Sequence, residues 1–231
     1  MKTYEAKIIA HIHNDFKTKF GVPRQSGLVQ KVTSTIVFEP EFRDSTALRG
    51  IEQFSHLWLI WQFSEAVRDD WSPTVRPPRL GGNKRMGVFA TRSPFRPNAI
   101  GLSSVKLEGI EQTSQGAVLY VSGADLMNGT PILDIKPYLP FTDSHPEAVG
   151  GFADEKFDYA LKVGIKPELL SALPIDKRDS LLELLAQDPR PSYQNDESRV
   201  YGFEYGNYEI KFTVSEGVLT VTEIIDNKAT C

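Results

Sequence analysis

His56-Leu57-Trp58-Leu59-Ile60-Trp61-Gln62-Phe63 is the stretch that decides the fold, because it is almost continuously apolar. So short a run, rich in aromatic residues, is typical of a buried strand, whereas a buried helix would be longer. Outward from it, other short runs alternate or carry β-branched residues, as strands do. They are residues 4–12, 29–39, 87–92, 100–110, 117–123 and 132–136. Since no helix alternates with these strands, the pattern favours an antiparallel barrel or sandwich over a parallel doubly wound sheet.

The last third of the chain has a different pattern. Leucines at helical spacing over residues 166–187 predict two helical pieces, which Pro174 separates. Three short runs after residue 200, with glycine-containing turns between them, predict a three-stranded meander. We therefore expect a β-barrel domain over residues 1–150. A small α+β domain, a helix pair plus the meander, should occupy residues 155–231.

Composition sets broad limits on the class of protein. The hydrophobic fraction of 40% and the charged fraction of 24% are ordinary for a globular chain. No run of about 18 apolar residues predicts a membrane span, and no signal region follows the N-terminus. The single cysteine, Cys231, is the last residue, which predicts a free thiol in the reducing cytoplasm.

Charge is distributed unevenly along the chain. The net charge is −4, yet residues 71–107 hold seven basic side chains and no acidic one. Unopposed positive charge repels itself, so it usually meets an anionic partner, and RNA is the class we favour. The alternative is a solvated basic face that acids from elsewhere in the chain neutralise.

The common nucleotide and metal motifs are missing from the sequence. Gly81-Gly82 lacks the spacing of a phosphate-binding loop, and no Gly-x-Gly-x-x-Gly joins a strand to a helix. The four histidines have no nearby acids or cysteines that would complete a metal site. A nucleotide ligand would therefore be bound by loops of the β domain, and we expect no metal.

The richest group of functional residue types lies between Arg76 and Gly101. Prolines stiffen this stretch, glycines allow close backbone approach, and arginines offer planar forks for phosphates and base edges. Phe95 beside Arg96 could stack a base. A further strand places Asp134 and Lys136 on one face. Asp134 is either a base or hydrogen-bond acceptor for the substrate, or the partner of Lys136 in a structural ion pair.

Several motifs together resemble one family, the TrmO (TsaA/YaeB) family of tRNA methyltransferases. The resemblance runs from about residue 4 to residue 145, and Asp188-Pro189-Arg190-Pro191 matches the C-terminal extension of the bacterial members. The motifs that carry it are Pro23-Arg24-Gln25, Phe54-Ser55-His56-Leu57-Trp58, Arg76-Pro77-Pro78-Arg79-Leu80-Gly81-Gly82, Gly87-Val88-Phe89-Ala90-Thr91-Arg92-Ser93, Arg96-Pro97-Asn98 and Asp134-Ile135-Lys136-Pro137-Tyr138-Leu139-Pro140.

The resemblance implies a fold, a reaction and an assembly. The expected fold is a seven-stranded antiparallel β-barrel. The expected reaction is methyl transfer from S-adenosylmethionine to N6 of threonylcarbamoyladenosine, at position 37 beside the anticodon of threonine tRNA. The expected assembly is a cytoplasmic homodimer with the cofactor bound near the subunit interface.

The resemblance also implies roles for individual residues. The expected cofactor-binding residues are Pro23, Arg24, Gln25, Phe63, Ser64, Arg92, Leu102, Asn128, Gly129, Thr130 and Pro131. Asp134, Lys136 and Tyr138 would sit near the reacting nitrogen as catalytic residues. The expected RNA-binding residues are Arg76, Arg79, Lys84, Arg85 and Arg96.

Two other functions stay open from the sequence. A non-catalytic RNA-binding module would use the same basic face and need no cofactor. A methyltransferase for a small anionic metabolite would use the basic loop to hold its substrate.

Overall fold

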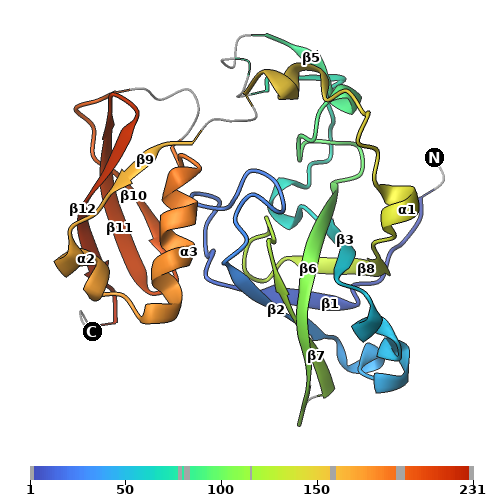
Figure 1. Cartoon of the computed structure of the whole chain (residues 1–231). Coiled ribbons are helices and arrows are strands. Elements are labelled where there is room, and N and C mark those ends of the chain that lie inside the picture. The colour runs from blue at the N-terminus through green and yellow to red at the C-terminus, as the bar shows by residue number, and fades with distance from the viewer. Residues whose placement is uncertain are drawn as a thin grey trace.

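A computed structural model describes residues 3–77, 80, 84–114, 116–156, 160–190 and 196–228 of the chain. It has two lobes, each built on its own sheet, which lie side by side in Figure 1. Arg79, an expected RNA-binding residue, and Cys231 lie outside the described residues.

The first lobe is a closed antiparallel barrel. In the described part of the chain its strands follow the order β1-β2-β7-β6-β3-β8. They span β1 Ala10–His13, β2 Thr33–Phe38, β3 His56–Gln62, β6 Ile100–Thr113, β7 Gly116–Ser122 and β8 Pro131–Pro137. The prediction of a mainly β protein with an antiparallel barrel is confirmed. The expected number of seven strands is wrong, since six close the barrel among these residues.

The strand predicted over residues 87–92 is the one that does not form. Only Met86–Gly87 (β5) pairs there, with Thr74–Val75 (β4), in a separate two-stranded sheet. The chain then turns into a 3-10 helix, η6 Val88–Ala90, in which the Thr91 N–H donates to the Val88 carbonyl. Arg96 Nη1 donates to the Val88 and Thr91 carbonyls at 3.2 and 2.6 Å. Because the nearby Arg96 side chain satisfies these carbonyls, the segment needs no neighbouring strand.

Strand β3 shows why the barrel closes around this stretch. Leu57, Leu59 and Trp61 alternate inward and are at most 6% exposed, while the residues between them are half-buried. Each fully buried leucine contributes about 1.5–3 kcal/mol. They pack with Ile12 and Leu119 from other strands in one core cluster. The strand hydrogen-bonds to β6 on one side and to β8 on the other, so it is central and its inward face is dry.

The second lobe is a four-stranded sheet covered by helices. The helical pieces are α2 Pro167–Ser171 and α3 Ile175–Ala186, with Pro174 at the N-cap of α3. The meander consists of β10 Tyr201–Tyr205, β11 Tyr208–Ser215 and β12 Val218–Asp226. These three strands form the predicted meander, and β9 Lys162–Gly164 adds an unpredicted fourth strand to the sheet, parallel to β12.

Short helices complete the described structure. They are the 3-10 helices η1 Pro40–Phe42, η2 Ser45–Leu48, η3 Ile51–Gln53, η4 Ser64–Ala66 and η7 Gly151–Lys156, and the α-helix α1 Pro140–Asp143. The Asp44 side chain caps η2 by accepting from the Thr46 N–H.

The two lobes are joined by the β1–β2 connection, residues 14–32, which reaches from the barrel toward α3 in Figure 1. Phe16, Val29 and Val32 of this connection are buried in the core cluster of the second lobe, with residues such as Leu181 and Phe212. Polar contacts add to this packing. Lys177 pairs with Asp15, and Glu183 accepts from the Gln30 and Lys31 N–H groups at 2.9 and 3.0 Å. The connection is therefore held by both lobes.

Candidate cofactor and active site

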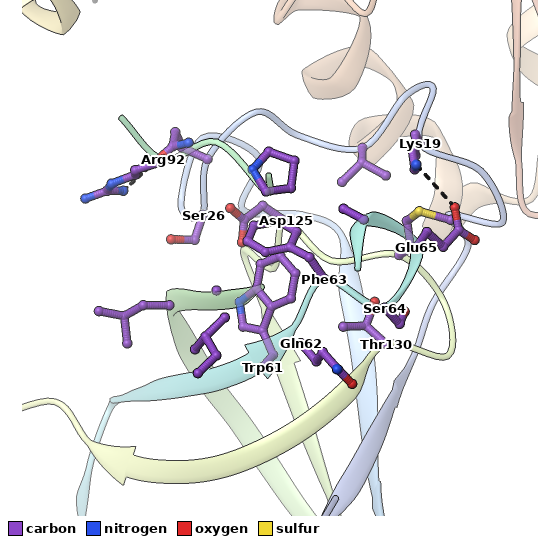
Figure 2. Close-up of a pocket in the computed structure, with 18 of the residues that line it drawn as sticks. Lys19, Ser26, Trp61, Gln62, Phe63, Ser64, Glu65, Arg92, Asp125 and Thr130 are labelled. Atoms are coloured by element: carbon purple, nitrogen blue, oxygen red, sulfur yellow. Dashed lines mark hydrogen bonds and ion pairs between the residues drawn. The ribbon is translucent and has the colours of Figure 1, made fainter. Parts of the chain in front are cut away.

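A cavity of about 920 Å³ opens at one end of the barrel, next to the β1–β2 connection. Its walls come from that connection, the end of β3, η4, residues 91–96, the start of β6 and residues 125–130. Figure 2 shows Trp61 and Phe63 at its base, with Arg92 on one side and Lys19 and Glu65 on the other. The volume is at the upper end of the usual range for small-molecule sites.

The structure gathers the expected cofactor-binding residues around this cavity. All of them except Pro131 line it, although they come from five separate segments of the chain. Pro131 is buried at the start of β8, directly after the lining residue Thr130. Their common location agrees with a shared ligand, while their individual contacts stay a prediction.

The base of the cavity is aromatic and fixed. The Trp61 and Phe63 rings lie 4.1 Å apart, centroid to centroid, and the Trp61 indole Nε1–H donates to Ser103 Oγ at 2.9 Å. Gly101 makes this position possible, since a Cβ there would lie 2.2 Å from Trp61 Cε2. The base of the cavity is apolar, and its indole N–H already has an acceptor, so this surface suits a flat ring or a methylene chain.

Pro23-Arg24-Gln25 lies over the cavity and is anchored from the second lobe. Arg24 Nη2 donates to the backbone carbonyls of Asp188 and Arg190 at 3.0 and 3.1 Å. Those two residues form a buried two-point ion pair, with Arg190 Nε and Nη2 2.8 and 2.9 Å from the Asp188 carboxylate oxygens. Gln25 Oε1 accepts from Arg92 Nη1 at 2.5 Å. Much of the Arg24 guanidinium is thus engaged with protein.

Asp125 is a residue in the cavity wall to which the sequence assigned no role. Its carboxylate accepts from Ser103 Oγ at 2.5 Å. The backbone N–H groups of Ser26 and of Asp125 itself also favour its charged form. Burial raises the pKa of the Asp125 carboxyl, against the opposing effects of these hydrogen bonds and of Arg92. In the sequence, Asp125 is a single acidic residue between an apolar strand and the Asn128-Gly129 turn. This position does not indicate that the Asp125 side chain points into a cavity.

The three expected catalytic residues lie outside the cavity lining. Asp134 and Lys136 share a face of β8 and form an ion pair, with 2.8 Å between Asp134 Oδ2 and Lys136 Nζ. That pair is the structural alternative that the sequence left open. The Tyr138 ring lies 5.5 Å from the ring of Trp58, which does line the cavity. Tyr138 therefore contacts a cavity-lining ring without lining the cavity itself.

The expected RNA-binding residues differ in their surroundings. Arg76, Lys84 and Arg85 are exposed, and Arg85 Nη1 donates to Thr74 Oγ1 at 3.0 Å. Arg96 lines the cavity, but its Nη1 holds η6 together through the two carbonyl bonds described above. The structure thus gives Arg96 a loop-ordering role.

Among the described residues, no helix is long and apolar enough to cross a membrane. In the same part of the chain, no three histidine, cysteine, aspartate or glutamate side chains gather in a way that could hold a metal ion.

Comparison with known proteins adds the family to this geometry. Residues 11–144 match the model of the tRNA-methyltransferase O N-terminal domain, and residues 160–227 match that of the TrmO C-terminal domain. The chain is 40% identical to the tRNA (adenine(37)-N6)-methyltransferase of Escherichia coli over 94% of this chain and 95% of that protein.

Two further similarities concern Pseudomonas aeruginosa. A protein described as a putative S-adenosylmethionine-dependent methyltransferase is 40% identical over 90% of this chain and 91% of its own length. A crystal structure of TrmO superposes with a TM-score of 0.78 at 31% identity, covering 97% of this chain and all of that one.

Fold, site and similarity together define a β-barrel methyltransferase that uses S-adenosylmethionine and acts on tRNA. The residues present fit that cofactor, because the cavity combines an aromatic base with polar and charged walls and has the volume of a small-molecule site. The chain belongs to the TrmO family, and it is a tRNA (adenine37-N6)-methyltransferase.

Proposed function

We propose that the substrate is threonylcarbamoyladenosine at position 37 of threonine tRNA, methylated at N6. The observation that carries this proposal is the charge around the cavity. A threonylcarbamoyl group adds a carboxylate to the base, and Arg92 lines the cavity with a neutral partner, the Gln25 amide. Its guanidinium is a suitable fork for a carboxylate.

The cofactor would be held by the expected set of lining residues. Phe63 and Leu102 would offer apolar contact, while Gln25, Asn128 and Thr130 would supply hydrogen-bonding groups. When bound, the cofactor supplies a methyl group on a sulfonium centre. The protein's part is to align the adenine N6 with that methyl group and to exclude water, which can lower a barrier by up to about 7–11 kcal/mol.

Asp134, Lys136 and Tyr138 stay a prediction as groups that orient the substrate base. They lie beside the cavity and would reach a tRNA that covers this face of β8. If Asp134→Ala keeps the wild-type turnover at saturating cofactor, the predicted role of Asp134 is wrong.

An aromatic and basic rim would bind the anticodon loop. Trp71 and Phe89 are 52% and 73% exposed, and their ring centroids lie 6.1 Å apart. The Arg68 guanidinium lies 3.9 Å above the centre of the Phe95 ring, and Phe95 lines the cavity. Unpaired RNA bases stack on such surfaces, while Arg76, Lys84 and Arg85 would contact phosphates, together with the predicted Arg79.

A homodimer is the second part of the proposal, with the cofactor near the subunit interface. Ile100 and Leu102 line the cavity mouth and are 46% and 57% exposed, so a second copy would cover apolar surface there. Sedimentation of the purified protein should give twice the mass of the chain. A monomer at the concentration of the activity assay would contradict this arrangement.

The substrate is tested with two forms of one tRNA. Threonine tRNA carrying threonylcarbamoyladenosine should accept a methyl group, and the same tRNA with plain adenosine at position 37 should not. Mass spectrometry of nucleosides from cells that lack the protein should show loss of the N6-methyl derivative. Equal methylation of both tRNAs would contradict the proposed substrate and leave adenine-N6 methylation standing.

Binding of tRNA should weaken as salt rises, because phosphate contacts release counterions. Replacing Lys84 and Arg85 together by alanine should flatten the plot of log Kd against log salt by about 0.7 per lost contact. Lys7→Ala, on the barrel side where Lys7 pairs with Glu41, is the matched control. An unchanged slope in the double variant would remove these residues from the interface.

A further inference from the structure

Asp125 is the half-buried acid of the cavity, and no role in the expected site accounts for it. It lies between Ser26 and Phe63 above the Trp61 ring in Figure 2. The other acid of the lining, Glu65, is exposed and pairs with Lys19 at 3.5 Å. Of these two carboxylates, Asp125 is therefore the more buried one.

Asp125 is held in place by a chain of hydrogen bonds. The Trp61 indole N–H donates to Ser103 Oγ, and the Ser103 hydroxyl donates to Asp125 Oδ1 at 2.5 Å. Ser103 and Trp61 are both buried, so this chain is shielded from water. The Ser103 hydroxyl holds the carboxylate, and the backbone N–H groups of Ser26 and of Asp125 itself also favour its charged form, all without supplying a formal charge.

The charged groups of the surrounding walls leave Asp125 without a close cation. The Arg92 charge acts on Asp125 without a direct hydrogen bond or ion pair between them, and Arg92 Nη1 donates to Gln25 Oε1. Arg24 and Arg96 are engaged with backbone carbonyls, and Lys19 with Glu65. A carboxylate fixed in this way can take up a proton, since no strong ion pair stabilises its charged form.

We propose that Asp125 accepts the proton that adenine N6 loses during methyl transfer. The nitrogen forms a bond to the methyl carbon, the carbon–sulfur bond breaks with its electron pair on sulfur, and the N6 proton moves to the Asp125 carboxylate. The products are the N6-methyl base, S-adenosylhomocysteine and protonated Asp125, which then releases its proton to water. This rests on the adenine-N6 activity of the family and does not depend on the threonylcarbamoyl group.

The pKa of Asp125 is shifted upward, which is the direction that this role requires. A stronger conjugate base removes a proton more readily, and Asp125 acts in its ionised form. Activity should therefore fall as the pH falls through the pKa of Asp125. This acidic limb should lie above the ordinary aspartate range.

The first test is Asp125→Asn, which keeps a similar shape and an oxygen that can accept from the Ser26 N–H. Single-turnover methylation of tRNA from cells lacking the enzyme should slow by about 10²–10⁴-fold. The Kd for S-adenosylmethionine, from isothermal titration, should stay unchanged. A weakened Kd with an unchanged rate at saturation would make Asp125 a cofactor-binding residue and overturn the proposal.

Glu108→Gln is the matched control. Glu108, on β6, accepts from Ser122 Oγ of β7 at 2.6 Å, and it does not line the cavity. The rate of this variant should equal that of the wild type. An equal loss in both variants would show that any broken serine–carboxylate pair is enough, and would overturn the proposal.

The pH profile gives a second, independent test. The wild type should show an acidic limb that Asp125→Asn lacks, and a carbon-13 carboxyl titration of the free protein should place Asp125 at the same pKa. Ser103→Ala removes a hydrogen bond that lowers this pKa, so it should move the limb to higher pH even if Asp125→Asn fails to fold. A limb that persists in Asp125→Asn, or disappears instead in Asp134→Asn, would overturn the proposal.

Discussion

At the scale of single residues, the site depends on a close approach that only glycine allows. Gly101 is buried beside Trp61, and the indole takes the space that a side chain would need. The position of the ring in turn directs its N–H to Ser103 and so to Asp125. A single missing Cβ thus supports both the aromatic base of the cavity and the position of the half-buried Asp125.

Gly101→Ala should therefore disturb the site as well as the fold. The new Cβ would lie 2.2 Å from Trp61 Cε2, so the ring must move. We expect a loss of about 1–3 kcal/mol in the free energy of unfolding, as for other overpacked cores, and a weaker Kd for S-adenosylmethionine. Urea unfolding and isothermal titration measure the two effects.

Gly109→Ala serves as the control, since its Cβ would meet nothing within 4 Å and it lies at the irregular pairing of β6 with β7. We expect a change within about 0.5 kcal/mol there. Equal losses in the two variants would show that the Trp61 contact is not the cause.

At the scale of elements, the β1–β2 connection decides how the two lobes act together. Its apolar residues belong to the core of the second lobe, and its Pro23-Arg24-Gln25 segment belongs to the cavity. Arg24 is tied to the carbonyls of Asp188 and Arg190. Docking of the second lobe should therefore order the cofactor-binding segment.

Gly21→Ala tests this coupling. Gly21 has φ +94°, and an added Cβ would lie 2.4 Å from the Phe203 ring of β10. The variant should unfold more easily and bind S-adenosylmethionine more weakly, although Gly21 is outside the cavity lining. Thermal unfolding and isothermal titration follow both properties.

Gly27→Ala separates strain from contact in the same connection. Gly27 has φ +80°, but its Cβ would meet nothing within 4 Å. The free energy of unfolding of this variant should fall by only about 1–2 kcal/mol, which is the cost of placing alanine in a left-handed backbone conformation. If Gly21→Ala is no worse than Gly27→Ala in either measurement, the Phe203 contact does not couple the lobes.

At the scale of the whole molecule, Tyr205 links the lobes through the shared core. Its ring lies 6.1 Å from that of Phe16 in the connection, and its hydroxyl is 2.6 Å from Ser180 Oγ in α3. Burial, the largest effect, raises the pKa of Tyr205 to about 12 from an ordinary value of 10.0. The folded protein therefore keeps this proton at pH values where the unfolded chain releases it.

Stability should fall as the pH rises from about 10 to about 12. Below that window both states are protonated, so the stabilising effect is complete; within it only the unfolded chain ionises. A shift of about two units corresponds to roughly 3 kcal/mol lost across the window. Urea unfolding of the wild type and of Tyr205→Phe across this range should give a steeper decline in the wild type. Parallel curves would show that Tyr205 does not ionise differently in the two states.

Local pattern in the sequence was enough for the barrel strands, the helix pair and the meander, because alternation, leucine spacing and turn residues act over a few positions. The motif residues likewise determined which side chains meet at the cavity.

The tertiary structure decided the features that depend on contacts between residues far apart in the chain. β9 joins β12 across the second lobe, although the two strands are more than 50 residues apart in the chain. The Asp125 side chain points into the cavity because the Ser103 hydroxyl donates to it and the Ser26 backbone favours its charged form. Arg24 is held by the carbonyl of Asp188, more than 160 positions away in the chain. Such contacts form only when the packed chain brings their partners together, so no local pattern encodes them.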